Sequence, residues 1–189
     1  MGNVTTVVLD RTVVSIIDSG VEEGERRLYR ILVDGHARGP IRLQRFFVPS
    51  IGVYDEGRFA AWCGTSFILS SIEDRPHRSV DCPEPIYAVY RVRHGWCVIG
   101  ELSVFMLDEG LTIVARRMHD EIITASSWSK GELELSDFYE VRLRLSVDED
   151  TMTLGEFTTF EVPGAGEVVM VEQDVSPELL DVAEPFFWP

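Results

Sequence analysis

Long apolar runs, paired cysteines and a basic leader are absent from this chain of 189 residues, and each absence excludes a class of protein. Apolar runs such as residues 104–107 and 168–171 fall far short of the roughly 18 residues that a membrane helix needs. The N-terminus has no basic region followed by a long apolar region, so we expect no secretory signal. Cys63, Cys82 and Cys97 form no CxxC pair, which favours reduced, buried thiols in a cytoplasmic protein.

The common cofactor and nucleophile motifs are also missing. The sequence has no GxGxxG or P-loop glycine pattern, no GxSxG elbow and no HExxH zinc motif. The acidic groups at residues 119–121 and 148–150 fall between expected strands, where polar turns are ordinary. We therefore predict no cofactor and no metal.

Charge is the strongest compositional signal. The chain has 32 acidic and 17 basic residues, a formal charge of −15, and every residue after Arg144 that carries charge is acidic. Such a chain repels phosphate, so we expect neither nucleic acid nor an anionic membrane as a partner. A cationic protein partner, or solubility alone, remains as the reason for the charge. The basic residues are arginines except for Lys130, a bias typical of GC-rich bacterial genomes.

The hydrophobic pattern is that of strands. In residues 138–147, apolar residues alternate with charged ones, which places the apolar set on one sheet face. Turn signals separate such runs every 8 to 12 residues or so, as hairpins in series require. The expected strands are residues 5–9, 12–17, 27–33, 41–48, 58–63, 66–72, 86–93, 96–107, 111–117, 121–125, 131–135, 138–147, 155–162 and 167–172.

The fold class predicted from this pattern is all-β, an antiparallel meander. A two-sheet sandwich or open barrel is the favoured arrangement, and a small propeller-like repeat of blade-like units is the alternative. The alternative rests on a 36-residue repeat, in which Gly64 and Glu73 correspond to Gly100 and Glu109. No family signature covers a useful length of the chain.

One short helix is expected at the C-terminal end. Ser176 is a good N-cap and Pro177 suits the first helical position, while Pro185 ends the helix. We expect residues 1–175 to form a single all-β domain, with residues 176–189 packed on it as a short helix and an aromatic tail.

Two candidate binding sites follow. The irregular loop at residues 73–85 either connects sheets rigidly or contacts a ligand, and a Cys82 nucleophile with His77 as base is the catalytic version. The aromatic tail either latches onto this protein's own core or enters a second copy, forming a homodimer. The candidate binding residues are Arg75, His77, Arg78, Asp81, Cys82, Phe186, Phe187 and Trp188.

The predicted function is a non-enzymatic binding module for a protein partner, one that the acidic surface suits to a cationic protein. The alternative is a small hydrolase that uses two carboxylates in a cleft near residues 73–85. Pairs such as Glu101 with Glu132, or Asp81 with His77, are its candidates, and only the three-dimensional structure can bring them together.

Overall fold

The computed structural model describes residues 4–9, 12–44, 47–55, 57–73, 76–129 and 131–160, and within these ranges it consists of strands without a helix. The all-β prediction is therefore confirmed. Among the described residues, no helix has the length and apolar character needed to cross a membrane. The strands are β1 (Val4–Leu9), β2 (Thr12–Glu23), β3 (Arg26–Val33), β4 (His36–Gln44), β5 (Ser50–Asp55), β6 (Arg58–Cys63), β7 (Ser66–Ser71), β8 (Arg78–Asp81), β9 (Ile86–Val92), β10 (Gly95–Gly100), β11 (Ser103–Asp108), β12 (Ile113–Met118), β13 (Ile123–Ser129), β14 (Glu132–Asp137), β15 (Arg142–Asp148) and β16 (Thr153–Thr159).

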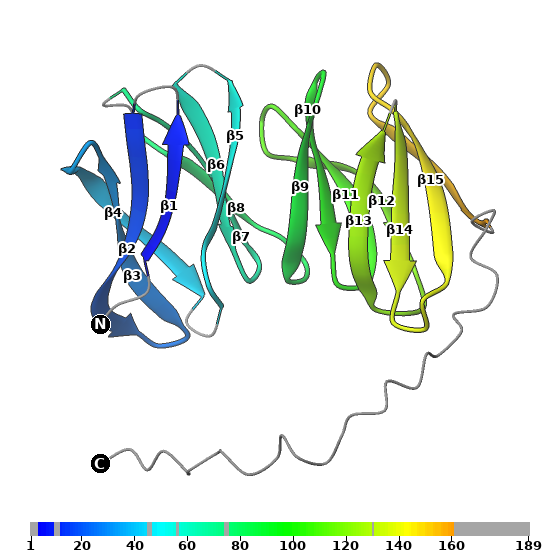
Figure 1. Ribbon diagram of the computed structural model, residues 1–189, viewed down its shortest axis with the longest axis horizontal. Coiled ribbons are helices and arrows are strands. Elements are labelled where there is room, and N and C mark those ends of the chain that lie inside the picture. Colours follow the sequence, from blue (N-terminus) through cyan, green and yellow to red (C-terminus); the bar gives the residue numbers. More distant parts are fainter. Residues whose placement is uncertain are drawn as a thin grey trace, which may run out of the picture.

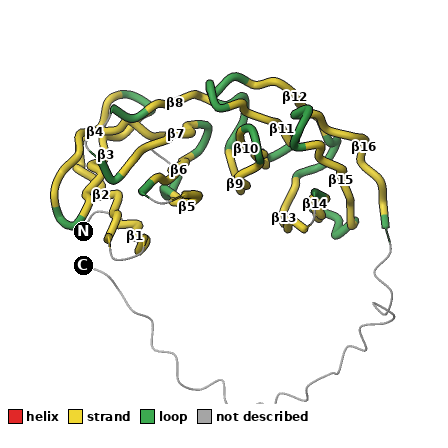
Figure 2. Tube along the Cα trace, turned by 90° about the horizontal axis from the view of Figure 1, so that it is seen from above, coloured by secondary structure: helices red, strands yellow, loops and turns green. Residues whose placement is uncertain are grey.

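Consecutive strands form four antiparallel meanders of four strands each. We name them sheet 1 (β1–β4), sheet 2 (β5–β8), sheet 3 (β9–β12) and sheet 4 (β13–β16). The sheets stand side by side in chain order (Figure 1) and follow an open arc, with the first strand of each on the concave side (Figure 2). The favoured arrangement, a two-sheet sandwich or open barrel, is thus wrong, and the blade-like alternative is the one that the chain adopts.

Three hydrophobic cores fill the spaces between neighbouring sheets. The first joins sheets 1 and 2, the second joins sheets 2 and 3, and the third joins sheets 3 and 4. In β6, Phe59, Ala61 and Cys63 face sheet 1, whereas the alternate residues Ala60 and Trp62 face sheet 3. A strand that is covered on both faces has no polar face to alternate with, which explains the continuous apolar run at residues 59–63.

This two-sided burial also gives the physical reason for the correction. A two-sheet sandwich leaves one face of every strand in water, and strands such as β10 and β11 have no such face. In β10 all six residues are buried, and in β11 the first five are. The runs apolar on both faces fall in the middle of the chain, where each sheet has a neighbour on both sides.

The predicted repeat corresponds to sheets 2 and 3. Gly64 and Gly100 each lie where the second strand of a sheet ends, and Glu73 and Glu109 each follow the third strand. Several strand boundaries differ from the prediction, and three differences change the number of strands. The run at residues 96–107 is divided into β10 and β11, the expected loop at residues 73–85 contains the short strand β8, and β5 was not predicted.

Several predictions fall beyond the described residues. These are the strand at residues 167–172, the helix that starts near Ser176, the aromatic tail, and the boundary at residue 175.

Phe105 tests the central core directly. Its side chain is fully buried between sheets 2 and 3, so Phe105→Ala leaves a cavity there, and we expect the free energy of unfolding to fall by about 3 to 5 kcal/mol. Urea unfolding measures the loss. Val114→Ala, at a side chain that is 48% exposed, serves as the control with an expected loss below about 1 kcal/mol. Equal losses for the two variants would contradict the face-to-face packing.

Candidate functional site

The connections that follow even-numbered strands all lie at one end of the sheets. Strand direction alternates along an antiparallel meander, so the connections inside sheets (β2–β3, β6–β7, β10–β11 and β14–β15) share this end with those between sheets (β4–β5, β8–β9 and β12–β13). We call it the lower rim, because it is at the bottom in Figure 1. The opposite end is the upper rim.

Backbone hydrogen bonds fix the lower rim. The amide of Cys82 donates to the carbonyl of Thr65 at 2.7 Å, and the amide of Ile86 donates to that of Gly64 at 2.8 Å. One sheet further along, His119 donates to Leu102 at 2.7 Å, and Ile123 to Glu101 at 2.8 Å. Each of these two connections between sheets is thereby bonded to the central turn of the sheet that precedes it.

Polar side chains in the same two connections also form hydrogen bonds or close polar contacts with the sheet that follows. Glu84, in the β8–β9 connection, accepts a hydrogen bond from the amide of Leu102 at 2.7 Å and one from the hydroxyl of Ser103. In the β12–β13 connection, Nε2 of His119 lies 3.3 Å from Oδ2 of Asp137. The rim is therefore held together across sheets and is suited to present side chains in fixed positions.

Asp137 organises the β14–β15 turn. Its side chain is only 5% exposed, and Oδ1 accepts hydrogen bonds from the amides of Tyr139 and Val141, each at 2.9 Å. The turn closes with Glu140 in the left-handed region at φ 63°. Residues 138–141 were predicted as the start of a strand, but this carboxylate-bonded turn delays the strand to Arg142.

The same turn displays two aromatic side chains to solvent. Phe138 is 64% exposed and Tyr139 is 67% exposed, and their rings meet edge to face with centroids 5.5 Å apart. Large aromatic groups on a rigid turn lose little conformational entropy on binding, and they are the residue types that dominate protein interfaces. The pair is thus a candidate binding feature of the described structure.

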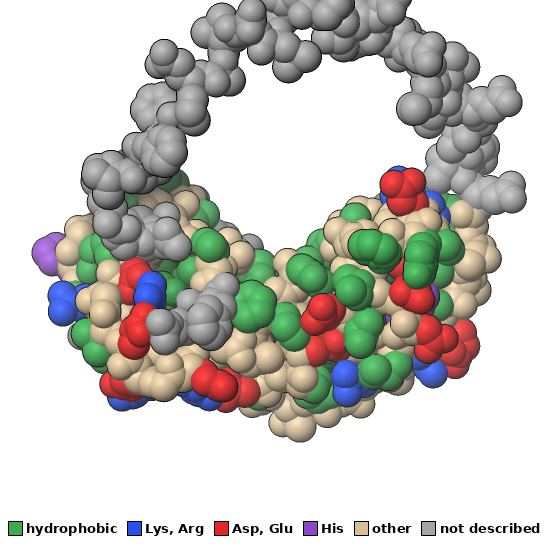
Figure 3. Space-filling view, turned by 90° about the horizontal axis from the view of Figure 1, so that it is seen from below, with side chains coloured by type: hydrophobic (Ala, Val, Ile, Leu, Met, Phe, Trp, Pro, Cys, Tyr) green, Lys and Arg blue, Asp and Glu red, His purple; other side chains and the backbone are tan. Residues whose placement is uncertain are grey.

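Other exposed apolar residues surround this pair at the lower-rim ends of sheets 3 and 4. Figure 3 views the molecule from this side and shows hydrophobic groups, interspersed with acidic ones, over these two sheets. We call the set the aromatic patch; it consists of Met118, Ile122, Phe138, Tyr139 and Val141, each at least 36% exposed. The exposed Asp120 and Glu140 flank it, with the half-buried Glu121 between the sheets.

Strand β8 divides the first predicted binding site. Arg78 and Asp81 are its first and last residues, so Cys82 leaves at the lower rim while His77 enters at the upper rim. Five residue steps along a strand separate their Cα atoms by about 16 Å, which does not support the Cys82–His77 pair. Asp81 is instead occupied by Arg26 at 2.6 Å and by the Ser66 hydroxyl at 3.0 Å. Arg75, Phe186, Phe187 and Trp188 lie outside the described residues.

A depression near this loop has the wrong chemistry for a carboxylate pair. Its lining includes Arg58, Arg78 and Arg91, and among the described residues that line it Glu109 is the one carboxylate. Glu109 is itself paired with Arg91 at 3.0 Å. The depression therefore does not supply the second carboxylate that the predicted hydrolase needs.

The cysteines are free and buried, as predicted. Burial raises the pKa of the Cys63 thiol to about 12, and burial together with Asp81 and Glu84 does the same at Cys82. Burial also raises the pKa of Cys97. Neutral, enclosed thiols are poor nucleophiles and poor metal ligands, which indicates a packing role.

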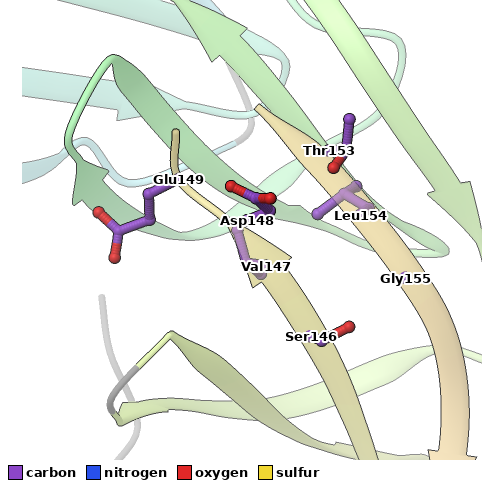
Figure 4. Close-up of a pocket in the computed structure, with 7 residues that line it drawn as sticks. All are labelled: Ser146, Val147, Asp148, Glu149, Thr153, Leu154 and Gly155. Carbon is purple, nitrogen blue, oxygen red and sulfur yellow. The ribbon is translucent and has the colours of Figure 1, made fainter. Parts of the chain in front are cut away.

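In the acidic turn at residues 148–150, the Asp148 carboxylate accepts hydrogen bonds from the amides of Asp150 and Thr151. Figure 4 shows an open depression between β15 and β16 that Asp148 lines. Hydrogen bonds from Thr151 hold the pKa of Asp148 below its usual range, and Glu149 accepts from the amide of Arg93 at 2.9 Å. Among the described residues, no three His, Cys, Asp or Glu side chains gather as a metal site would require.

The likeness to one solved WD40 domain supports the fold. The chain resembles the WD40 domain of Pan2 from Neurospora crassa with a TM-score of 0.51 and 11% identity, over 82% of this chain and 51% of that one. It also aligns with residues 644–1017 of HIRA, with a TM-score of 0.49, 10% identity, and coverages of 84% and 53%. The chain thus spans about half the length of the solved structures it matches. No protein-family model and no curated protein matches it.

The likeness to the Pan2 domain agrees with the blade-like arrangement of the four sheets. WD40 domains are propellers, in which four-stranded blades surround an axis. The described residues of the present chain form four consecutive blades of that kind on an open arc, and the likeness extends to the fold alone.

The Asp137 carboxylate is open to a direct test. Asp137→Ala removes the acceptor for two turn amides and the partner of His119, so we expect the free energy of unfolding to fall by about 2 to 3 kcal/mol. Asp137→Asn keeps a carbonyl oxygen in place and should lose less than half as much. Urea unfolding of the three proteins decides; identical curves for wild type and Asp137→Ala would show that the turn does not depend on this group.

Thiol chemistry gives a pH-dependent prediction. With pKa values near 12, about one in 10⁴ of the Cys63 and Cys82 thiols is ionised at pH 8, so iodoacetamide should label the folded protein slowly and the urea-unfolded protein rapidly. Unfolded thiols lose their protons near pH 8.5, whereas the folded ones keep them. Stability should therefore fall as the pH rises above about 8.5. Fast labelling of the native protein at pH 8 would contradict the buried positions.

Proposed function

We propose that the protein is a non-enzymatic interaction module that binds a protein partner through the aromatic patch on its lower rim. The observation that carries this proposal is the pair Phe138 and Tyr139, held in solvent by the buried Asp137 carboxylate. A protein has no structural need to expose two adjacent aromatic rings on a rigid turn. A partner that covers them gains their buried area at a small entropic cost.

The charges around the patch favour a cationic partner. Asp120 and Glu140 are exposed beside it, and Arg142 is the exposed base that follows the turn. The whole chain carries −15, so the long-range field also attracts a basic protein and repels nucleic acid. The recognised element would combine an apolar anchor, which contacts the rings, with flanking Lys or Arg residues. The free thiols are consistent with a cytoplasmic setting for this interaction.

Affinity capture with matched variants tests the proposal. The tagged protein is incubated with lysate of its source organism, and retained proteins are quantified by mass spectrometry at 0.1 M and 0.5 M salt. We expect a stoichiometric basic partner that the wild type retains and the double variant Phe138→Ala/Tyr139→Ala loses, with at least about 100-fold weaker binding. Retention by the wild type should drop at 0.5 M salt, because exposed charges are screened there.

The control is Ile113→Ala/Val114→Ala, which removes two exposed apolar side chains at the start of β12, far from the lower rim. This variant should retain the partner at the wild-type level. Retention that is equal for all three proteins, or the absence of any stoichiometric partner, would reject the aromatic patch as a binding surface.

A further inference from the structure

The outer face of sheet 1 carries a cluster of apolar side chains and has no neighbouring sheet among the described residues. Strand register places alternate residues of β1–β4 on this face, opposite the set that packs against sheet 2. Val8, Val13 and Val21 lie on it with exposed fractions of 65%, 39% and 48%. Partly buried Ile17, Leu28 and Leu32 lie between them. An apolar sheet face of this kind is ordinarily covered.

The outer face of sheet 4, at the other end of the arc, has different side chains from the outer face of sheet 1. On the outer face of sheet 4, Arg144 lies opposite Glu134 in the strand register and pairs with it at 2.9 Å and with Glu132 at 3.3 Å. Most neighbouring positions on that face are serine, threonine and arginine, together with Ala125 and with Phe160, whose ring centroid lies 4.5 Å from the Arg144 guanidinium. Among the described residues, sheet 4 thus presents paired charges and hydroxyl groups on its outer face, whereas the most exposed side chains on the outer face of sheet 1 include three valines. A second copy of the chain could cover sheet 1 by packing its own sheet 4 against it. That contact is unfavourable, because it would bury the charged groups of sheet 4 against the valines of sheet 1.

The chain itself contains a segment with complementary properties. Residues 161–189, which follow the described structure, contain seven acidic residues and no basic one. They also contain the apolar run at residues 168–171, two adjacent leucines at 179–180, and Phe186, Phe187 and Trp188. The outer face of sheet 1 offers apolar surface together with the exposed Arg30 and Arg42, of which Arg42 pairs with Glu23 at 2.7 Å.

The segment is long enough to reach this face. The described chain ends at Phe160, after the last strand of sheet 4. Three sheet-to-sheet spacings of about 10 Å separate sheet 4 from sheet 1 along the arc, a path of roughly 30 Å. The 29 residues that follow Phe160 can extend to about 100 Å. Covalent attachment at the other end of the arc also raises their effective concentration at the face.

We propose that residues 161–189 fold back across the open arc and cover the outer face of sheet 1 within the same chain. The apolar run and the terminal aromatics pack on Val8, Val13 and their neighbours, while acidic residues of the segment lie near Arg30. The segment then acts as the covering layer that a neighbouring sheet supplies elsewhere in the arc. This inference does not depend on the aromatic patch, since it involves the opposite end of the arc.

Hydrogen exchange of the full-length chain, followed by mass spectrometry, tests the proposal. We expect peptides within residues 162–188 to be protected in the wild type. In Val8→Glu/Val13→Glu these peptides should exchange at least about tenfold faster, because two acids on the face repel the acidic segment and interrupt the apolar surface. Peptides from β10 and β11 should stay protected, which shows that the variant is folded.

The control variant Ile113→Glu/Val114→Glu introduces the same charges at exposed positions of sheet 3 and should leave exchange of residues 162–188 unchanged. Three results would overturn the proposal. These are rapid exchange of residues 162–188 in the wild type, protection that persists in Val8→Glu/Val13→Glu, and protection that increases with protein concentration over a 100-fold range. The last result would indicate that the segment covers a second copy.

Discussion

Face-to-face packing between four-stranded sheets is the interaction on which the whole structure depends. Each sheet alone is a meander of short strands, which cannot bury its apolar side chains without a neighbour. Sheets 2 and 3 are covered on both faces, and strands such as β10 are therefore buried along their whole length. The order of the sheets follows the order of the chain, because each connection leads directly to the next sheet. Sheets 1 and 4, at the two ends of the arc, each have one outer face with no neighbouring sheet among the described residues, and the side chains on these two faces differ.

The connections that the stacking requires also create the surface to which we assign function. Because β12 ends and β13 begins at the lower rim, His119 comes within reach of Asp137 in the following sheet. Asp137 in turn fixes the amides of Tyr139 and Val141, and the rings of Phe138 and Tyr139 remain in solvent. Stability and display are thus coupled in one turn. The carboxylate serves the fold, and we propose that the residues that it positions serve recognition.

The sequence predicted the strands well and the arrangement of the sheets less well. Periodicity located most strands and the 36-residue repeat, because these are local properties of the chain. The choice between a sandwich and a blade-like array depends on whether both faces of a strand are covered, and a short apolar run such as residues 96–99 does not say what covers it. The composition of residues 73–85 predicted a binding loop. Strand β8 runs through this segment and separates its residues between opposite rims, so they do not form one site. The aromatic patch was missed because Phe138 and Tyr139 continued an alternating strand pattern, although Asp137 before them is a common turn residue.

The central claim is that the Phe138–Tyr139 turn contacts another protein, and site-specific photo-cross-linking tests it most directly. A photoreactive phenylalanine analogue is placed at position 139 and, separately, at the exposed position 114 of β12, in the full-length protein within its own cells. The account predicts a discrete adduct with one other protein from position 139, and none from position 114. No adduct from position 139, or the same adducts from both positions, would contradict it.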